Sequence, residues 1–112
     1  MNSKPIFVAF ANPKLENNFN KLKAGKFEDK QLHNFLERAI SDLKKNPICG
    51  KKVPKTLWPR GYIKNYQINN LWKYDLPDGW RLVYSIFEDK IIIINLILEW
   101  FTHKEYEKRF GY

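Results

Sequence analysis

The chain is poor in the residues that build disulfides and metal centres. Its 112 residues include one cysteine, Cys49, and two histidines, His33 and His103. A single cysteine cannot form a disulfide within the chain, and no Cys/His cluster of the kind that holds zinc can be assembled from these three residues. We therefore expect neither a metal site nor a cofactor.

Long apolar runs are also missing. No stretch is long and uncharged enough to span a bilayer, and residues 1–4 lack the extended apolar region of a secretory signal. We therefore expect a cytoplasmic protein with no membrane association.

What the chain does contain is apolar and basic. A hydrophobic content of 44% with 16% aromatic residues excludes intrinsic disorder, and the length fits a single domain spanning residues 1–112. Twenty basic and 12 acidic side chains give a net charge of +8, which favours a polyanionic partner. The alternative, lysines that are simply solvated, is about as common.

Three segments alternate between apolar and polar residues. In residues 71–76, Trp72 and Tyr74 alternate with Lys73 and Asp75, and similar patterns follow in residues 80–86 and 91–101. Such alternation predicts half-buried strands, here a three-stranded antiparallel sheet with one face on a core. The side chains expected together on the other, open face are Lys73, Asp75, Arg81, Ser85, Asn95 and Glu99.

The first half of the chain predicts one strand and two helices. Residues 6–11 favour a strand, Asn12-Pro13 is typical of a helix start, and Gly25 is placed to end that helix. Apolar residues at helical spacing between residues 32 and 43 predict a second helix, with His33 at its solvated boundary. With a capping box at Thr102–Glu105 starting a short C-terminal helix, the expected fold is α+β: an antiparallel sheet of about four strands packed on two N-terminal helices.

Residues 48–70 are expected to form a long basic connection. Its cations, expected to contact nucleic-acid phosphates, are Lys51, Lys52, Lys55, Arg60 and Lys64. They are interleaved with Trp58, Tyr62 and Tyr66, a mixture that suits phosphate attraction and base stacking. The aromatic side chains can instead pin the loop to the body, and we favour that interpretation for them, with a short helical turn at residues 62–66.

The C-terminal segment offers groups for proton transfer. His103 falls in the first turn of the predicted helix, where the helix dipole favours a neutral imidazole, or it is a simple helix-terminal residue. Tyr106 follows one turn later, as a functional phenol or as a core aromatic packed on Phe110. Both would lie near the end of the strand that bears Glu99.

These elements resemble the RelE/ParE superfamily of bacterial and archaeal toxins from toxin–antitoxin systems. Residues 79–86, GWRLVYSI, are similar to the Gly-aromatic-Arg-Leu-Val-Tyr strand of RelE and YoeB toxins, followed as there by an acidic turn and a hydrophobic strand. The order of elements and the C-terminal His-x-x-Tyr extend the resemblance over nearly the whole chain. It implies a RelE-like microbial RNase fold.

The resemblance also implies an activity: metal-independent, ribosome-dependent cleavage of mRNA in the A site by attack of the 2'-hydroxyl on the adjacent phosphate. Arg81 matches the arginine that stabilises transition-state charge, and Lys73 matches a phosphate-contacting lysine. His103 and Tyr106 fall near the C-terminal catalytic positions, and Glu99 is an alternative base. The implied partners are mRNA, the ribosome and a cognate antitoxin.

The chain departs from RelE at Asp75, where those toxins carry a second lysine. A carboxylate there repels phosphate or pairs with Lys73 or Arg81. Two other functions therefore stay open: a non-catalytic member like the gyrase-inhibiting ParE toxins or a degenerate RelE-like binding module, and a basic scaffold protein that holds a partner peptide.

Overall fold

The computed structural model describes residues 4–111 and has the expected α+β class. The strands are β1 (Ile6–Phe10), β2 (Lys51–Lys52), β3 (Trp72–Asp75), β4 (Arg81–Glu88) and β5 (Ile93–Phe101). The helices are α1 (Pro13–Lys21), α2 (Phe27–Lys45), α3 (Tyr62–Tyr66) and α4 (His103–Phe110). Four short 3-10 turns join them: η1 (Leu22–Ala24), η2 (Pro47–Cys49), η3 (Lys55–Leu57) and η4 (Pro77–Gly79).

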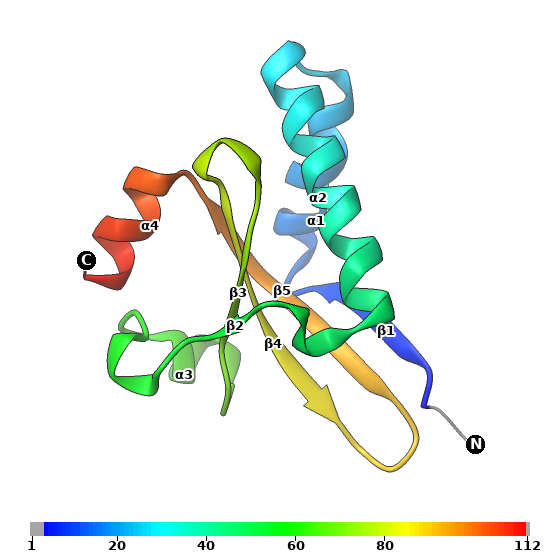
Figure 1. Cartoon of the computed structure of the whole chain (residues 1–112), viewed down its shortest axis with the longest axis vertical. Helices are drawn as coiled ribbons and strands as arrows, with labels where there is room; N and C mark the ends of the chain where they lie inside the picture. Colours follow the sequence, from blue (N-terminus) through cyan, green and yellow to red (C-terminus); the bar gives the residue numbers. More distant parts are fainter. Residues whose placement is uncertain (1–3, 112) are drawn as a thin grey trace.

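The five strands form one mixed sheet in the order β1-β5-β4-β3-β2 (Figure 1). The strands β3, β4 and β5 are antiparallel neighbours, as their alternation predicted, but β1 runs parallel to β5. The expectation of about four antiparallel strands was therefore incomplete. Alternation along a strand reports which face is buried, and it carries no information about the direction of a neighbour far away in the chain.

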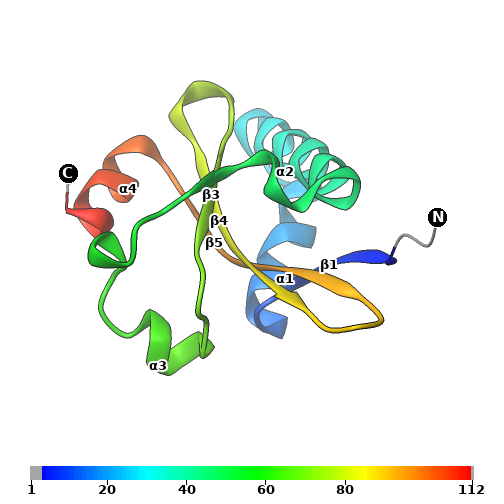
Figure 2. The same ribbon diagram turned by 60° about the horizontal axis from the view of Figure 1, so that its bottom comes forward.

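Helices α1 and α2 cover one face of the sheet, called here the α1–α2 face. Asn12 caps α1 by accepting a hydrogen bond from the Leu15 N–H (2.9 Å), and Pro13 occupies the first helical position, as predicted. The apolar stripe of α2, including Leu36 and Leu43, packs on the sheet. Figure 2 shows α1 and α2 on one side of the strands and α3 and α4 on the other.

His33 is buried rather than solvated. Its side chain stacks on Phe19 of α1, with ring centroids 4.5 Å apart, and its Nδ1 lies 3.0 Å from a Glu37 carboxylate oxygen. The α2 sequence alone suggested a boundary position because the neighbour that covers His33 belongs to another helix.

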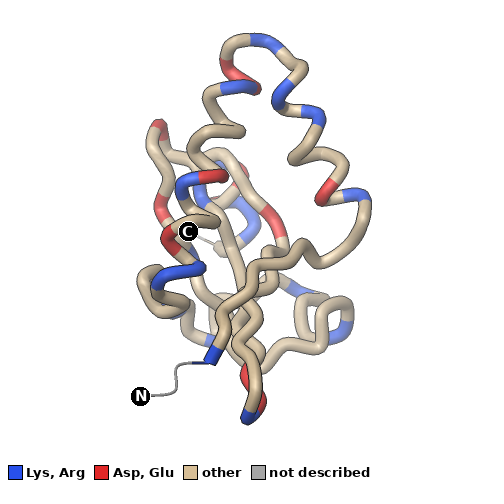
Figure 3. The backbone as a smooth tube through the Cα atoms, turned by 90° about the vertical axis from the view of Figure 1, so that its right-hand side faces the viewer, with Lys and Arg blue, Asp and Glu red and all other residues tan. Residues whose placement is uncertain are grey.

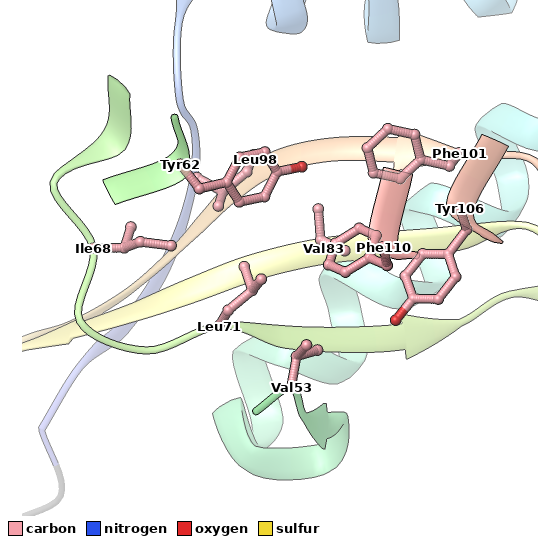
Figure 4. Packing of buried hydrophobic residues seen from close by; sticks show 9 residues of the cluster. All are labelled: Val53, Tyr62, Ile68, Leu71, Val83, Leu98, Phe101, Tyr106 and Phe110. Atoms are coloured by element: carbon pink, nitrogen blue, oxygen red, sulfur yellow. The ribbon is translucent and has the colours of Figure 1, made fainter. Parts of the chain in front are cut away.

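The opposite face, called here the α4 face, is not open. A second core fills it, made of residues from the 53–71 connection, the sheet and α4 (Figure 4). Trp58 fixes the connection by donating from its indole N–H to the Val53 carbonyl (2.9 Å), and the ring of Tyr62 packs edge-on against both Tyr66 and Phe110. The loop aromatics therefore pin the connection, which is the interpretation the sequence favoured, and residues 62–66 form the expected helical turn.

A bulge in β5 decides which side chains share a face. Val83 of β4 pairs with Glu99 and Tyr84 pairs with Ile97, so Leu98 is an extra residue between them. The alternation of β5 therefore changes phase at this point. Lys73, Asp75, Arg81, Ser85 and Glu99 share the α4 face as predicted, whereas Asn95 lies on the α1–α2 face.

Asn95 is fully buried there. Its amide nitrogen donates to the Leu43 carbonyl in the last turn of α2 (3.2 Å) and to the Phe7 carbonyl of β1 (3.3 Å). The Leu43 carbonyl is among those that a helix end leaves without an intrahelical donor. One side chain thus links β5, α2 and the edge strand.

No helix within residues 4–111 combines the length and the apolar character that crossing a bilayer requires.

We predict that Asn95→Ala lowers the free energy of unfolding by about 1–3 kcal/mol, because the buried Leu43 carbonyl and the partly buried Phe7 carbonyl lose their donor. Urea denaturation monitored by circular dichroism measures this change. Asn17→Ala, at an exposed position of α1, is the matched control and should stay within about 0.5 kcal/mol of wild type. Equal stability of the two variants would show that the Asn95 amide does not hold these elements together.

Candidate nucleic-acid interface

The strands β2, β3 and β4 bring three cations around one carboxylate. Lys51 pairs in register with Lys73, and Asp75 pairs with Arg81. The Asp75 carboxylate lies 3.0 Å from Arg81 Nε, 3.5 Å from Lys73 Nζ and 4.0 Å from Lys51 Nζ. We call these four residues the Asp75 cluster. The pairing of Asp75 with Lys73 and Arg81 is one of the two outcomes that the sequence predicted.

Within the cluster, Arg81 and Lys73 are only partly exposed, with 18% and 22% of their side chains accessible. The Arg81 Nε contact with Asp75 is an ion pair whose angle is not that of a hydrogen bond, and one terminal nitrogen donates to the Trp80 carbonyl (3.1 Å). The guanidinium is therefore held by one hydrogen bond and one ion pair. Its Nε–H forms no hydrogen bond with Asp75, so the stronger, charge-assisted hydrogen bond is not made there.

The Tyr106 ring lies beneath Lys73 and Arg81. Lys73 Nζ lies 5.5 Å and Arg81 Cζ 5.9 Å from the centre of its ring, within the range of cation–π attraction. The ring is buried and stacks on Phe110 (4.4 Å), and its hydroxyl points toward β3 in Figure 4. Tyr106 is thus a core aromatic residue packed on Phe110, which is one of the two roles that the sequence suggested. It also contacts Lys73 and Arg81, the candidate phosphate-binding residues.

His103 is the first residue of α4 and lies at the edge of the candidate site, which we call its rim. The Thr102–Glu105 capping box that starts α4 is present as predicted. The imidazole is 56% exposed and contacts Glu107 one turn along the helix. Gly79, in the turn before Arg81, approaches so closely that a Cβ there would lie 3.1 Å from the His103 Cβ, and its φ of +79° also favours glycine. This close approach places His103 beside the hairpin that carries Arg81.

Glu99 is engaged elsewhere. It accepts a short hydrogen bond from the Tyr62 hydroxyl, and an Arg109 nitrogen lies 3.3 Å from the same carboxylate oxygen. Burial, followed by the bond to Glu99, raises the pKa of the Tyr62 phenol well above its ordinary value, so Tyr62 remains the donor. Glu99 therefore ties α3 and α4 to β5 and forms no hydrogen bond or ion pair with Arg81.

The five loop cations do not form one cluster. Lys51 belongs to the Asp75 cluster, whereas Lys52 pairs in register with Trp72 and so faces the other side of the sheet edge. Lys55 and Lys64 are exposed on η3 and α3, and Arg60 lines a groove beside α4. Figure 3 shows Lys and Arg along the α1–α2 hairpin as well as around the sheet, so the positive charge is not confined to one surface.

Sequence reasoning missed the basic residues of α4. Lys108 and Arg109 follow the predicted site residue Tyr106 by two and three positions. Both line a groove beside α4, and Arg109 also pairs with Glu99. Their spacing from Tyr106 on the same helix was the available signal. It looked like ordinary positive charge at a helix end.

The chain matches none of the protein-family models, curated proteins or solved structures with which it was compared. Among residues 4–111, no three His, Cys, Asp or Glu side chains are grouped so that they could hold a metal ion. The candidate site therefore stands on its geometry: Lys73, Arg81 and Tyr106 in contact, His103 at the rim and Glu99 outside it.

We predict that Asp75→Asn tightens binding of a short 2'-O-methyl RNA about twofold to fivefold, because Lys73 and Arg81 lose the carboxylate that competes with phosphate. The size corresponds to roughly 0.4–1 kcal/mol, the upper part of the range typical of exposed ion pairs. Fluorescence anisotropy measures the affinity. Asp78→Asn removes the same charge from the turn of the same hairpin, and an equal gain in that variant would reduce the effect to net charge.

Proposed function

We propose that this protein is a RelE-like toxin with the corresponding RNase fold, a metal-independent endoribonuclease that cuts mRNA on the ribosome. The observation that carries the proposal is the pair of partly buried cations, Lys73 and Arg81, held side by side above Tyr106. Two positive charges brought together at low exposure favour an anionic ligand between them. A cognate antitoxin and the cytoplasm complete the setting proposed for it.

The proposed reaction needs charge stabilisation and two proton transfers. The 2'-oxygen of the RNA forms a bond to phosphorus while the bond from phosphorus to the 5'-oxygen breaks, leaving a cyclic phosphate and a 5'-hydroxyl. Arg81 and Lys73 stabilise the charge on the phosphorane, and Asp75 gives up its contacts with them when phosphate binds. His103, exposed at the rim, is the group that exchanges protons with the reacting oxygens.

Tyr106 acts as a positioning residue in this proposal. Its ring is buried between the cations and Phe110, so it sets where Lys73 and Arg81 lie. Glu99 has no part in the chemistry, because its carboxylate is already bound by Tyr62 and Arg109.

We predict that Arg81→Ala lowers the rate of A-site cleavage about 10²–10³-fold, the usual cost of one electrostatic stabiliser. The measurement is mapping of mRNA cuts in a purified translation system with stalled ribosomes. Because Arg81 is partly buried, Arg81→Gln is tested beside it, and thermal unfolding verifies the fold of both. Arg38→Ala, on the exposed side of α2, controls for loss of one positive charge and should cut like wild type.

Substitutions of the two proton-transfer candidates separate them. His103→Ala should lower cleavage about 10²–10⁴-fold. Glu99→Gln should cut at close to the wild-type rate, since a Gln oxygen still accepts from Tyr62. The reverse pattern in the same cleavage assay would move the base to Glu99.

A non-catalytic role is the second candidate, and Asp75 is the observation that favours it. Its single negative charge contacts all three cations and offsets part of the positive charge that would otherwise meet phosphate. A ParE-like toxin, or a degenerate RelE-like module that binds without cutting, would retain the fold and lose the chemistry. Intact mRNA at high protein concentration, with Asp75→Asn equally inactive, would favour this second function.

A further inference from the structure

A groove lies on the side of α4 away from the Asp75 cluster. It has a volume of about 500 Å³ and runs between the 59–60 segment and the last two turns of α4. Its lining residues are Pro59, Arg60, Glu105, Lys108 and Arg109. Three of these five side chains are cationic and one is anionic.

Two of the groove's charges already have partners. Arg109 pairs with Glu99 (3.3 Å) and lies over the Phe101 ring (5.2 Å). Glu105 accepts a hydrogen bond from the Thr102 backbone N–H (2.9 Å), and this bond is the main reason that its pKa lies below the ordinary value. Glu105 is therefore held at the helix cap, and its single negative charge offsets only part of the positive charge of the groove.

The other two cations have no such partner. Within residues 4–111, no carboxylate lies at ion-pair distance from Arg60 or Lys108. Like charges that converge on a groove repel one another, and an anion between them removes that cost. The pair therefore places two positive charges without carboxylate partners along one groove, an arrangement that suits a phosphate group.

Helix α4 connects this groove with the Asp75 cluster. Tyr106 turns toward Lys73 and Arg81, whereas Lys108, two residues later, faces the 59–60 segment. Tyr106 and Lys108 differ by only about 3 Å along the axis, and a helix with its side chains is about 10–12 Å wide, so the two surfaces are separated by roughly one helix diameter. A flexible polyanion can contact both.

We propose that the Arg60–Lys108 groove binds a backbone phosphate of single-stranded RNA, on the same strand as the phosphate held by Lys73 and Arg81. The identity of the strand rests on the proposed function. The groove contact itself involves no chemistry, so it is testable without cleavage. Its occupant is the phosphodiester backbone and not a base, because its side chains present charge and no exposed aromatic ring.

The test measures binding of a fluorescent 2'-O-methyl RNA, which lacks the attacking hydroxyl, by anisotropy between about 50 and 200 mM salt. The variant is Arg60→Ala/Lys108→Ala. Each phosphate contact to a single strand contributes about 0.7 to the slope of log affinity against log salt, so loss of the one contact in the groove should lower the slope by about 0.7, together with weaker binding. Lys23→Ala/Lys30→Ala is the matched control, because it removes two exposed cations from the α1–α2 hairpin.

An unchanged slope in the groove variant, an equal fall in the control, or no binding by the wild-type chain would each overturn the groove. Failure of the proposed nuclease looks different. A wild-type chain that binds the RNA through the groove and leaves ribosomal mRNA intact refutes the nuclease and retains the groove. Cleavage that depends on Arg81, with the salt slope untouched by the groove variant, refutes the groove alone.

Discussion

The extra residue in β5 is the constraint on which both sides of the molecule depend. Because Leu98 is inserted opposite the Val83–Tyr84 step, Leu98 and Glu99 both serve the α4 face, while Asn95 is turned toward α2. A strand with unbroken alternation would have put Asn95 and Glu99 on the same face and left the α2 end without its donor. The bulge thus lets a single strand satisfy two cores and one buried polar link.

The second consequence of this arrangement is electrostatic. The α4 face is covered over its centre by the 53–71 connection and α4, so its polar residues gather at two places on the margin. At one, Asp75 balances Lys73 and Arg81; at the other, Glu99 balances Arg109 and accepts from Tyr62. Each carboxylate lowers the cost of burying positive charge beside an aromatic core. A carboxylate that is 43% exposed, as Asp75 is, can exchange with phosphate far more readily than one locked by a buried phenol.

Local chemistry explains which features the sequence could predict. The Asn12-Pro13 start of α1, the Thr102–Glu105 capping box and the alternation around Lys73 all depend on neighbours within a few residues, and each was predicted correctly. What escaped prediction depends on distant partners. The bulge at Leu98, the parallel pairing of β1 with β5 and the capture of Glu99 by Tyr62, 37 residues earlier, are fixed only when separate elements pack. The structure therefore brings Lys73, Arg81 and Tyr106 together and holds Glu99 apart from them, against Tyr62 and Arg109.

Helix α4 contributes residues to both cationic surfaces. Its first turn sets His103 against the hairpin, its middle supplies the Tyr106 ring beneath Lys73 and Arg81, and its last turns bring Lys108 to the groove at Arg60. An eight-residue helix has little stability of its own, so its position is held by the Phe110 and Tyr106 contacts with the core. The hydrophobic packing on one side of α4 therefore determines the charge pattern on its other sides, and a change in that core would alter both cationic surfaces together.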